Sequence, residues 1–193
     1  MIQLRPSRYI LAVTGASGMP YAVYLASALA DTPDREVHVI ISEAAKKILR
    51  LETVDGLDVL QAKATKIWEP DDIAGSPASG SWQHDGMIVC PCSMASLAAI
   101  ANGLASNLIL RAADVTLKEK RPLILVPRET PYSRIHLQNM LAVHDAGAII
   151  LPPCPGFYAR PQTINDLLAH VCGRILDQLH IPQHLFAEWS GDQ

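Results

Sequence analysis

Charged and aromatic residues are both scarce in this chain of 193 residues. Asp, Glu, Lys and Arg make up 18% of it, against about 25% in an average soluble protein, and aromatic residues make up 5%. Hydrophobic residues reach 49%, which excludes an intrinsically disordered chain. The net charge is -3, and no basic run marks a nucleic-acid-binding surface. We expect small aliphatic side chains to fill the core and part of the surface to be buried between copies of the chain.

Long apolar runs and paired cysteine motifs are also missing. No segment approaches the roughly 18 apolar residues that cross a bilayer, and the first residues show no signal-peptide pattern. The four cysteines are Cys90, Cys92, Cys154 and Cys172. They form no pair of Cys-x-x-Cys motifs, and His136 and His144 lack ligand partners at metal-binding spacing. We therefore expect reduced thiols, no metal, no nucleic-acid or membrane partner, and a cytoplasmic location.

Apolar strands alternate with helical segments along the sequence. Short apolar runs that stop at Gly or Pro predict strands, and Ala- and Leu-rich segments between them predict helices. The expected strands are 9–14, 36–41, 87–90, 123–126 and 148–151; the expected helices are 21–30, 43–51, the segment after Ser93, the segment around 108–115, 135–144 and 167–179. Strands apolar on both faces predict a parallel sheet covered by helices on both sides. We expect a three-layer, doubly wound α/β fold of the Rossmann/flavodoxin-like type, with residues 1–193 forming one domain.

The residues that follow the strands are suited to binding an anion. In open α/β sheets, ligands bind beyond the carboxyl ends of the strands, near helix N-termini. Hydroxyl groups or a cation follow most of these ends, in segments 14–18, 42, 91–96, 127–131 and 152–158. A mononucleotide phosphate is the natural occupant of such a site. The 15–18 turn alone is equally explained by backbone geometry that requires glycine, and the irregular region 55–84 contains a loop, 75–81, long enough to suggest a function.

A dinucleotide-dependent dehydrogenase is one alternative. The segment Thr14-Gly-Ala-Ser-Gly18 begins like the turn of short-chain reductases, but Pro20 stands where a third glycine completes the fingerprint. The Tyr-x-x-x-Lys pair that such reductases use for proton transfer is absent from the sequence. Both observations argue against this alternative.

Several short motifs together form a family signature. They are Gly15-Ala-Ser-Gly18, Ser79-Gly-Ser81, Cys90-Pro-Cys-Ser93, Arg111-Ala-Ala-Asp-Val115, Leu117-Lys-Glu119, Val126-Pro-Arg-Glu-Thr-Pro131 and Pro155-Gly-Phe-Tyr158. In this order they closely resemble the flavin prenyltransferase family of the UbiX/Pad type, from the first strand to Trp189. The combination of Arg-Ala-Ala-Asp with Val-Pro-Arg-Glu is the most specific part.

The resemblance implies an enzyme that transfers a dimethylallyl group from dimethylallyl phosphate to N5 and C6 of reduced FMN. The product, prenylated FMN, is the cofactor of partner decarboxylases. Members of the family are cytoplasmic homododecamers and need no metal for the transfer. The sequence does not distinguish a monophosphate from a diphosphate donor, and it does not identify the decarboxylase.

The resemblance also implies which residues bind FMN. They are Gly15, Ala16, Ser17, Ser42, Ser93, Met94, Ala95, Ser96 and Arg128. Backbone N–H groups, hydroxyls and a guanidinium suit a phosphate and the polar atoms of a flavin. Helix capping explains one of the pair Ser93 and Ser96 but not both, which favours a role in binding.

Dimethylallyl phosphate binding is assigned in the same way to Tyr158, Arg174, Lys118 and Ser79. Cations and a phenol stabilise a departing phosphate more than the intact ester, which is the requirement for catalysis. On helix pattern alone, Arg174 and Lys118 are equally explained as solvated surface residues. Trp189 either covers the site from a neighbouring chain or docks the tail.

Glu52, Glu129, Ser17 and Lys118 are the catalytic candidates. Glu129 would protonate the leaving phosphate, and Glu52 would accept the proton from flavin C6. Without the resemblance, Glu52 would be interpreted as a surface charge. Arg111 and Asp114, at i and i+3, are expected to form an ion pair.

Two alternatives within a flavoprotein fold stay open: an FMN-dependent peptidyl-cysteine decarboxylase, and a non-catalytic flavin carrier or decarboxylase subunit. The turn after the first strand lacks the histidine base that such decarboxylases need. This chain also departs from the family at Ser96, where Thr is common, and at Ile73, where some members have Trp, so the preferred prenyl donor is left open.

Overall fold

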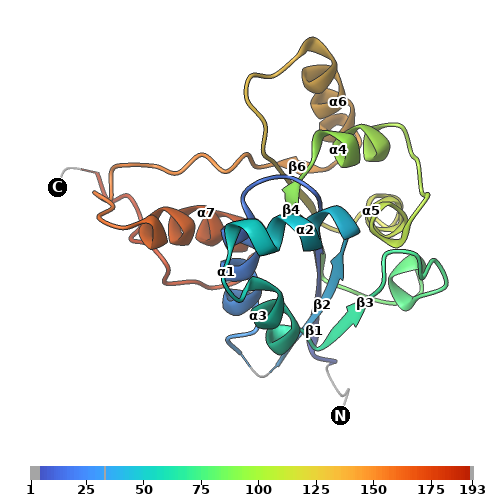
Figure 1. Ribbon diagram of the computed structural model, residues 1–193, viewed down its shortest axis with the longest axis horizontal. Coiled ribbons are helices and arrows are strands. Elements are labelled where there is room, and N and C mark those ends of the chain that lie inside the picture. The colour runs from blue at the N-terminus through green and yellow to red at the C-terminus, as the bar shows by residue number, and fades with distance from the viewer. Residues whose placement is uncertain (1–4, 33, 192–193) are drawn as a thin grey trace.

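A single parallel sheet lies between two layers of helices in the computed structural model, which describes residues 5–32 and 34–191 (Figure 1). The strands are β1 Ser7–Val13, β2 Arg35–Ile41, β3 Lys66–Trp68, β4 Gly86–Cys92, β5 Leu123–Pro127 and β6 Ile149–Ile150. The helices are α1 Met19–Leu29, α2 Glu43–Glu52, α3 Gly56–Lys63, α4 Met94–Ala101, α5 Leu108–Lys118, α6 Arg134–Asp145 and α7 Ile164–Gln178, with a 3₁₀ turn at Ser76–Ala78. The strand order is β3-β2-β1-β4-β5-β6, with all neighbours parallel. This is the doubly wound order, and the predicted fold class is confirmed.

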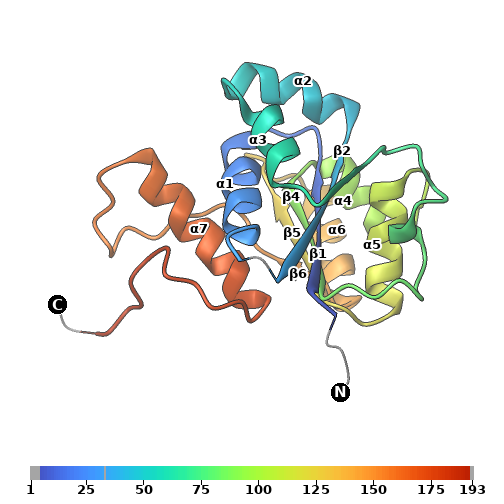
Figure 2. The same ribbon diagram turned by 90° about the horizontal axis from the view of Figure 1, so that it is seen from below.

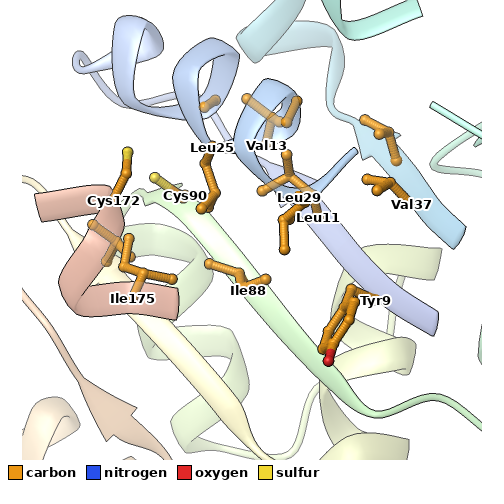
Figure 3. Packing of buried hydrophobic residues seen from close by; sticks show 14 of the residues in the cluster. Tyr9, Leu11, Val13, Leu25, Leu29, Val37, Ile88, Cys90, Cys172 and Ile175 are labelled. Atoms are coloured by element: carbon orange, nitrogen blue, oxygen red, sulfur yellow. The ribbon is translucent and has the colours of Figure 1, made fainter. Parts of the chain in front are cut away.

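Two apolar cores lie on the two faces of the sheet, because successive side chains along each strand point to opposite faces. Leu11 of β1 and Ile88 of β4 pack with α1 and α7 in one core (Figure 3). Ile10 and Met87, their chain neighbours, pack with α4 and α5 in the other. Figure 2 shows α1 and α7 on one side of the strands and α5 on the other. Because helices cover both faces of the sheet, side chains on both sides of each strand are buried, and the central strands therefore contain uninterrupted apolar runs.

The structure differs from the sequence prediction mainly between Asp55 and His84. This region, expected to be irregular, contains α3 and the edge strand β3. Both elements are short, and β3 exposes Lys66 and half-exposes Ile67, so neither carries the long apolar pattern on which the prediction relied. The strand expected at 148–151 is also shorter, since β6 spans only Ile149–Ile150.

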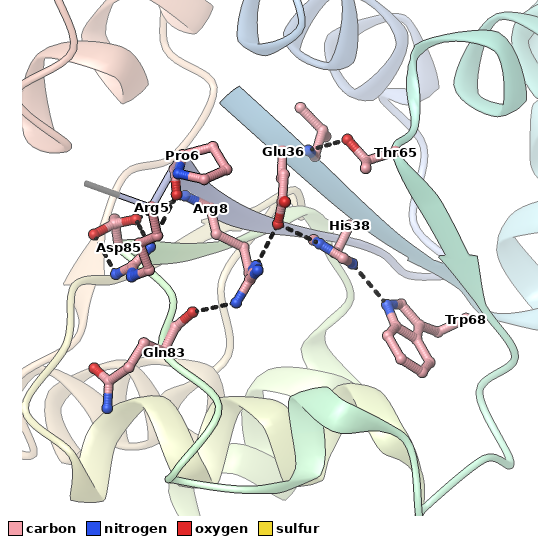
Figure 4. Close-up of polar contacts among 10 residues, drawn as sticks. Arg5, Pro6, Arg8, Glu36, His38, Thr65, Trp68, Gln83 and Asp85 are labelled. Atoms are coloured by element: carbon pink, nitrogen blue, oxygen red, sulfur yellow. Dashed lines mark hydrogen bonds and ion pairs between the residues drawn. The ribbon is translucent and has the colours of Figure 1, made fainter. Parts of the chain in front are cut away.

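Polar side chains tie β1, β2 and β3 together on the α5 side of the sheet (Figure 4). The Glu36 carboxylate accepts hydrogen bonds from Arg8 and His38, and the Trp68 indole donates to His38 Nδ1 at 3.1 Å. The hydrogen bond from Arg8 is the main reason that the pKa of Glu36 is lowered. This long-range network holds the edge strand β3, which is only three residues long.

His84 makes stability depend on pH, because its imidazole is only 3% exposed. Burial, reinforced by the charge of Arg121, lowers the pKa of His84 to about 4, whereas the unfolded chain protonates this histidine near its ordinary pKa of 6.5. Between pH 6.5 and 4 this histidine is therefore protonated in the unfolded chain but neutral in the folded chain. We expect the free energy of unfolding to fall by about 3 kcal/mol between pH 6.5 and 4 through this group.

Urea unfolding of wild type and His84→Gln at a fixed protein concentration tests this expectation. The acid loss should be smaller in His84→Gln, whereas His144→Gln, which changes an exposed histidine on α6, should match wild type. Equal acid losses in wild type and His84→Gln would contradict it.

Candidate functional site

The strand order reverses between β1 and β4, so the carboxyl ends of these two strands form the crevice where doubly wound folds bind ligands. Thr14 joins the two ends. Its hydroxyl donates to the Pro91 carbonyl at 2.8 Å and accepts from the Ser93 N–H at 2.8 Å. Thr14, expected at the end of the first strand and the start of the turn, was assigned no role of its own, although a hydroxyl at the end of a buried strand was the available signal. Its bonds set the spacing between the β1–α1 turn and the start of α4.

Glu52 lies at the N-terminus of α1. Its Oε2 accepts hydrogen bonds from the backbone N–H groups of Gly18 at 2.8 Å and Met19 at 2.9 Å. Gly18 has a φ of 109°, a conformation that favours glycine, and this turns both N–H groups toward the carboxylate. The sequence alone favoured a surface charge at this position, but the carboxylate is half-buried and accepts two backbone hydrogen bonds, which excludes that interpretation.

The environment of Glu52 keeps it ionised. Partial burial raises its pKa, but hydrogen bonds from Ser17, Met19 and Gly18 and the charge of Arg128 outweigh burial, and the net pKa lies below the usual value. Because Glu52 takes the free N–H groups of α1 and Pro20 has none, the start of this helix is not open to a phosphate. A dinucleotide dehydrogenase needs that position for its pyrophosphate, so the geometry argues against this alternative.

Ser17 connects Glu52 with Arg128. The Ser17 hydroxyl helps to lower the pKa of Glu52, while the Ser17 backbone carbonyl accepts from Arg128 Nε at 3.2 Å. Arg128 follows β5 and is half-buried, and Glu129 next to it accepts from the Thr130 N–H at 2.9 Å. The segments that follow two strands, β1 and β5, thus meet the end of helix α2 here. We call Ser17, Glu52 and Arg128 the strand-end cluster.

The remaining residues expected to bind FMN start helices around this cluster. A Cβ at Gly15 would lie 2.5 Å from the Ala44 Cβ, so only glycine lets the turn approach α2. Ser42 caps α2 and accepts from the Ala45 N–H at 3.1 Å. Ala16 is buried within the turn.

Ser93 caps α4 in the same manner. Its hydroxyl accepts from the Ser96 N–H at 3.2 Å and lies 3.0 Å from the Ser96 hydroxyl. Capping therefore accounts for the Ser93 hydroxyl, whereas the Ser96 hydroxyl bonds, among the described residues, only to that of Ser93 and has no capping role of its own. The N–H groups of Met94 and Ala95, in the first turn of α4, have no acceptor within their own helix. They are the donors that this helix start offers to a ligand.

Ser79 and Lys118 lie elsewhere in the same chain. Lys118 ends α5 and pairs with Glu119, and a Cβ at Gly80 would come within 2.9 Å of its Nζ. The 80–85 segment also contacts the start of β1, where the Asp85 N–H donates to the Arg8 carbonyl at 2.7 Å. These contacts place Ser79 and Lys118, which we call the α5 end, near the amino ends of the strands, away from the strand-end cluster.

Tyr158, in the segment before α7, and Arg174, on α7, form a third group. They line a cavity of about 1210 Å³ together with residues of the 181–189 tail, and we call it the α7 pocket. The Tyr158 side chain is 42% exposed and packs edge-on against Trp189, with ring centroids 5.4 Å apart. Arg174 is exposed and pairs with Asp177 at 3.1 Å. In Figure 1 the segment between β6 and α7 extends past the sheet to the far end of α7.

Other expectations about side chains have mixed outcomes. Arg111 and Asp114 form the predicted ion pair, with 2.7 Å between Nη1 and Oδ2. Ile73 is exposed.

Among residues 5–32 and 34–191, no cluster of three or more His, Cys, Asp or Glu side chains is arranged to hold a metal ion. Within the same ranges, no helix has the length and apolar character needed to cross a membrane.

Known proteins with similar sequences are flavin prenyltransferases. The flavoprotein family model matches residues 3–176. Flavin prenyltransferase LpdB of Lactiplantibacillus plantarum is 48% identical over 96% of this chain and 99% of its own length. Flavin prenyltransferase UbiX of Pseudomonas aeruginosa is 46% identical over 96% of this chain and 95% of its own length.

Solved structures agree with the sequence relatives. AnUbiX (PadA1), in complex with FMN and dimethylallyl pyrophosphate, has a TM-score of 0.95 at 42% identity and covers 98% of this chain and 100% of its own. The peptidyl-cysteine decarboxylase EpiD has a TM-score of 0.63 at 16% identity, which shows a shared fold alone. The sequence identity to the prenyltransferases, by contrast, is 42% or more over nearly the whole chain and shows common ancestry. The chain belongs to the UbiX/Pad-type flavin prenyltransferase family.

Proposed function

We propose that this protein is a flavin prenyltransferase that joins a dimethylallyl group from dimethylallyl phosphate to N5 and C6 of reduced FMN. The strand-end cluster carries this proposal, because the β1–α1 turn binds both a carboxylate and a guanidinium: its Gly18 and Met19 N–H groups donate to Glu52, and its Ser17 carbonyl accepts from Arg128. A base and a cation beside one ligand site are what the reaction requires. The names of the relatives and the ligands of AnUbiX support the same activity.

The residues around the cluster fit FMN. Gly15 lets the β1–α1 turn lie close to α2, and the starts of α2 and α4 present Ser42 and the N–H groups of Met94 and Ala95. Arg128 supplies a cation beside them. We assign FMN binding to these residues together with Ala16, Ser17, Ser93 and Ser96. Reduced FMN is the acceptor substrate, and it supplies the electron-rich N5 and C6 atoms.

Breaking the C–O bond of dimethylallyl phosphate leaves negative charge on the departing phosphate. Arg128, Lys118 and Arg174 are cations that would stabilise this charge, and the Tyr158 hydroxyl would donate a hydrogen bond to it. Glu129, adjacent to Arg128, would deliver a proton to the leaving group. Ser79 would close over the substrate.

Glu52 would accept the proton that C6 loses when the second bond forms. Its lowered pKa makes it a weak base, but restoring the aromatic ring makes the C6 proton strongly acidic, so a weak base suffices. Ser17 would hold the carboxylate in place through its hydrogen bond.

These residues meet only if copies of the chain assemble. The α5 end and the α7 pocket lie away from the strand-end cluster within one chain, and Lys118, Tyr158 and Arg174 are exposed. We infer that each complete site combines residues of neighbouring copies in a homododecamer. A UbiX-like protein of Escherichia coli O157:H7, 45% identical with a TM-score of 0.93, is dodecameric, which supports this assembly.

We further propose that residues 1–193 form one flavin-binding domain, that the protein works in the cytoplasm, and that its product passes to a decarboxylase that depends on prenylated FMN. The family's activity supports the last point, because the modified flavin leaves the enzyme as a product and needs an acceptor protein.

Anaerobic incubation of the purified protein with reduced FMN and dimethylallyl phosphate tests the activity. We expect mass spectrometry to find a flavin heavier by one prenyl unit, with dimethylallyl diphosphate as a parallel donor. Protein with bound FMN that leaves the flavin mass unchanged with both donors would instead indicate a carrier.

A further inference from the structure

The buried histidine beside Tyr158 adopts a defined tautomer. His170, on α7, is 9% exposed, and its Nδ1 accepts the Gly156 N–H at 3.3 Å. A backbone N–H can only donate, so Nδ1 carries no proton and the neutral ring carries its proton on Nε2. Burial, followed by the charge of Arg174, lowers the pKa of His170, which keeps the ring neutral near pH 7.

The Nε2 proton of His170 points to the phenol. Nε2 lies 3.3 Å from Tyr158 Oη, and because Nε2 is the donor, Oη is the acceptor. The Tyr158 hydroxyl proton is then left to donate to another group. A chain of hydrogen bonds thus runs from the Gly156 N–H through His170 to Tyr158.

Packing around His170 holds this chain in place. The Phe186 ring lies against the imidazole, with centroids 4.8 Å apart, and a Cβ at Gly173 would lie 2.5 Å from Phe186 Cε1. A Cβ at Gly156 would lie 3.0 Å from Tyr158 Cε1 and 3.1 Å from His170 Nε2. Two glycines therefore allow the tail and the 156–158 segment to close on the ring pair.

We propose that His170 is a positioning residue that turns the Tyr158 hydroxyl proton toward the phosphate of the prenyl donor. The proposal rests on the proposed function, since it needs Tyr158 to bind that phosphate. His170 itself does not touch the substrate. Because His170 donates to Oη, the phenolic proton already points outward into the α7 pocket before the donor binds. This orientation lowers the free-energy cost of ordering the hydroxyl on binding.

A double-mutant cycle separates positioning from packing. His170→Phe keeps an aromatic ring but removes the N–H donor, and His170→Gln keeps a donor. With FMN bound and left oxidised, so that no transfer occurs, calorimetry measures the affinity for dimethylallyl phosphate. We expect His170→Phe to weaken binding about tenfold, His170→Gln to recover most of the loss, and His170→Phe to have little further effect when added to Tyr158→Phe.

The kinetic counterpart uses reduced FMN. The KM for dimethylallyl phosphate should rise in His170→Phe, while FMN affinity and the thermal unfolding midpoint stay close to wild type. Equal losses from His170→Phe in the wild-type and Tyr158→Phe backgrounds, or a His170→Gln variant no better than His170→Phe, would overturn the positioning role. Failure of wild type to bind dimethylallyl phosphate would overturn the proposed function, and the positioning role with it.

Discussion

Glu52→Gln is expected to slow closure of the new ring by about 10²–10⁴-fold, the usual contribution of a general base, while FMN binds almost as in wild type. The glutamine oxygen can still accept hydrogen bonds from the Gly18 and Met19 N–H groups that Glu52 binds at 2.8 and 2.9 Å. The start of α1 therefore keeps its cap. What disappears is the ionised carboxylate that would take the C6 proton.

Mass and absorption spectra of single-turnover samples measure this effect. Flavin joined to the prenyl group at N5 alone should accumulate, and the closed product should appear slowly. Glu43→Gln is the matched control, because Glu43 starts the same helix, is exposed and pairs only with Lys46 among the described residues. Wild-type turnover in Glu52→Gln would show that Glu52 is not the base.

Co-expression of Glu52→Gln and Arg174→Ala chains is expected to restore activity that neither variant has alone. Loss of the Arg174 cation should reduce kcat/KM by about 10²–10³-fold, as when one donor to a developing oxyanion is removed. Arg174 is exposed and bonded only locally, to Asp177, so its removal should leave the fold intact. If the α7 pocket of one copy serves the strand-end cluster of another, mixed oligomers contain sites with both residues intact.

The control pairs two changes within one cluster. Glu52→Gln and Arg128→Ala both damage the strand-end cluster, and both residues bond to the β1–α1 turn of the same chain. Their co-expression should create no intact cluster and no recovery. The two mixtures are compared by measuring the activity of tagged, mixed oligomers. If the mixture of Glu52→Gln and Arg174→Ala chains shows no more recovery than the control mixture, the site is not shared between copies.

The sequence by itself determined the layered architecture. The runs 9–13 in β1 and 87–90 in β4 are apolar at every position, and only a sheet covered on both faces buries them all. The regular apolar positions of α7 predicted that helix for the same reason, since its period matches one buried face. The prediction missed α3 and β3 because their short segments are stabilised mainly by distant partners, as in the hydrogen bond from Trp68 to His38.

The sequence also identified the residues of the strand-end cluster through the family motifs, but only the tertiary structure decided how they are arranged. Glu52 ends α2, 34 residues beyond Gly18, and no local pattern shows that its carboxylate caps α1. The hydrogen bond from His170 to Tyr158 likewise depends on where the tail and the 156–158 segment pack. Local propensity and periodicity determine elements within one stretch of chain, whereas contacts between distant stretches depend on packing. Packing also placed Lys118, Tyr158 and Arg174 apart from the cluster, and from this separation we infer that a complete site combines residues of more than one copy.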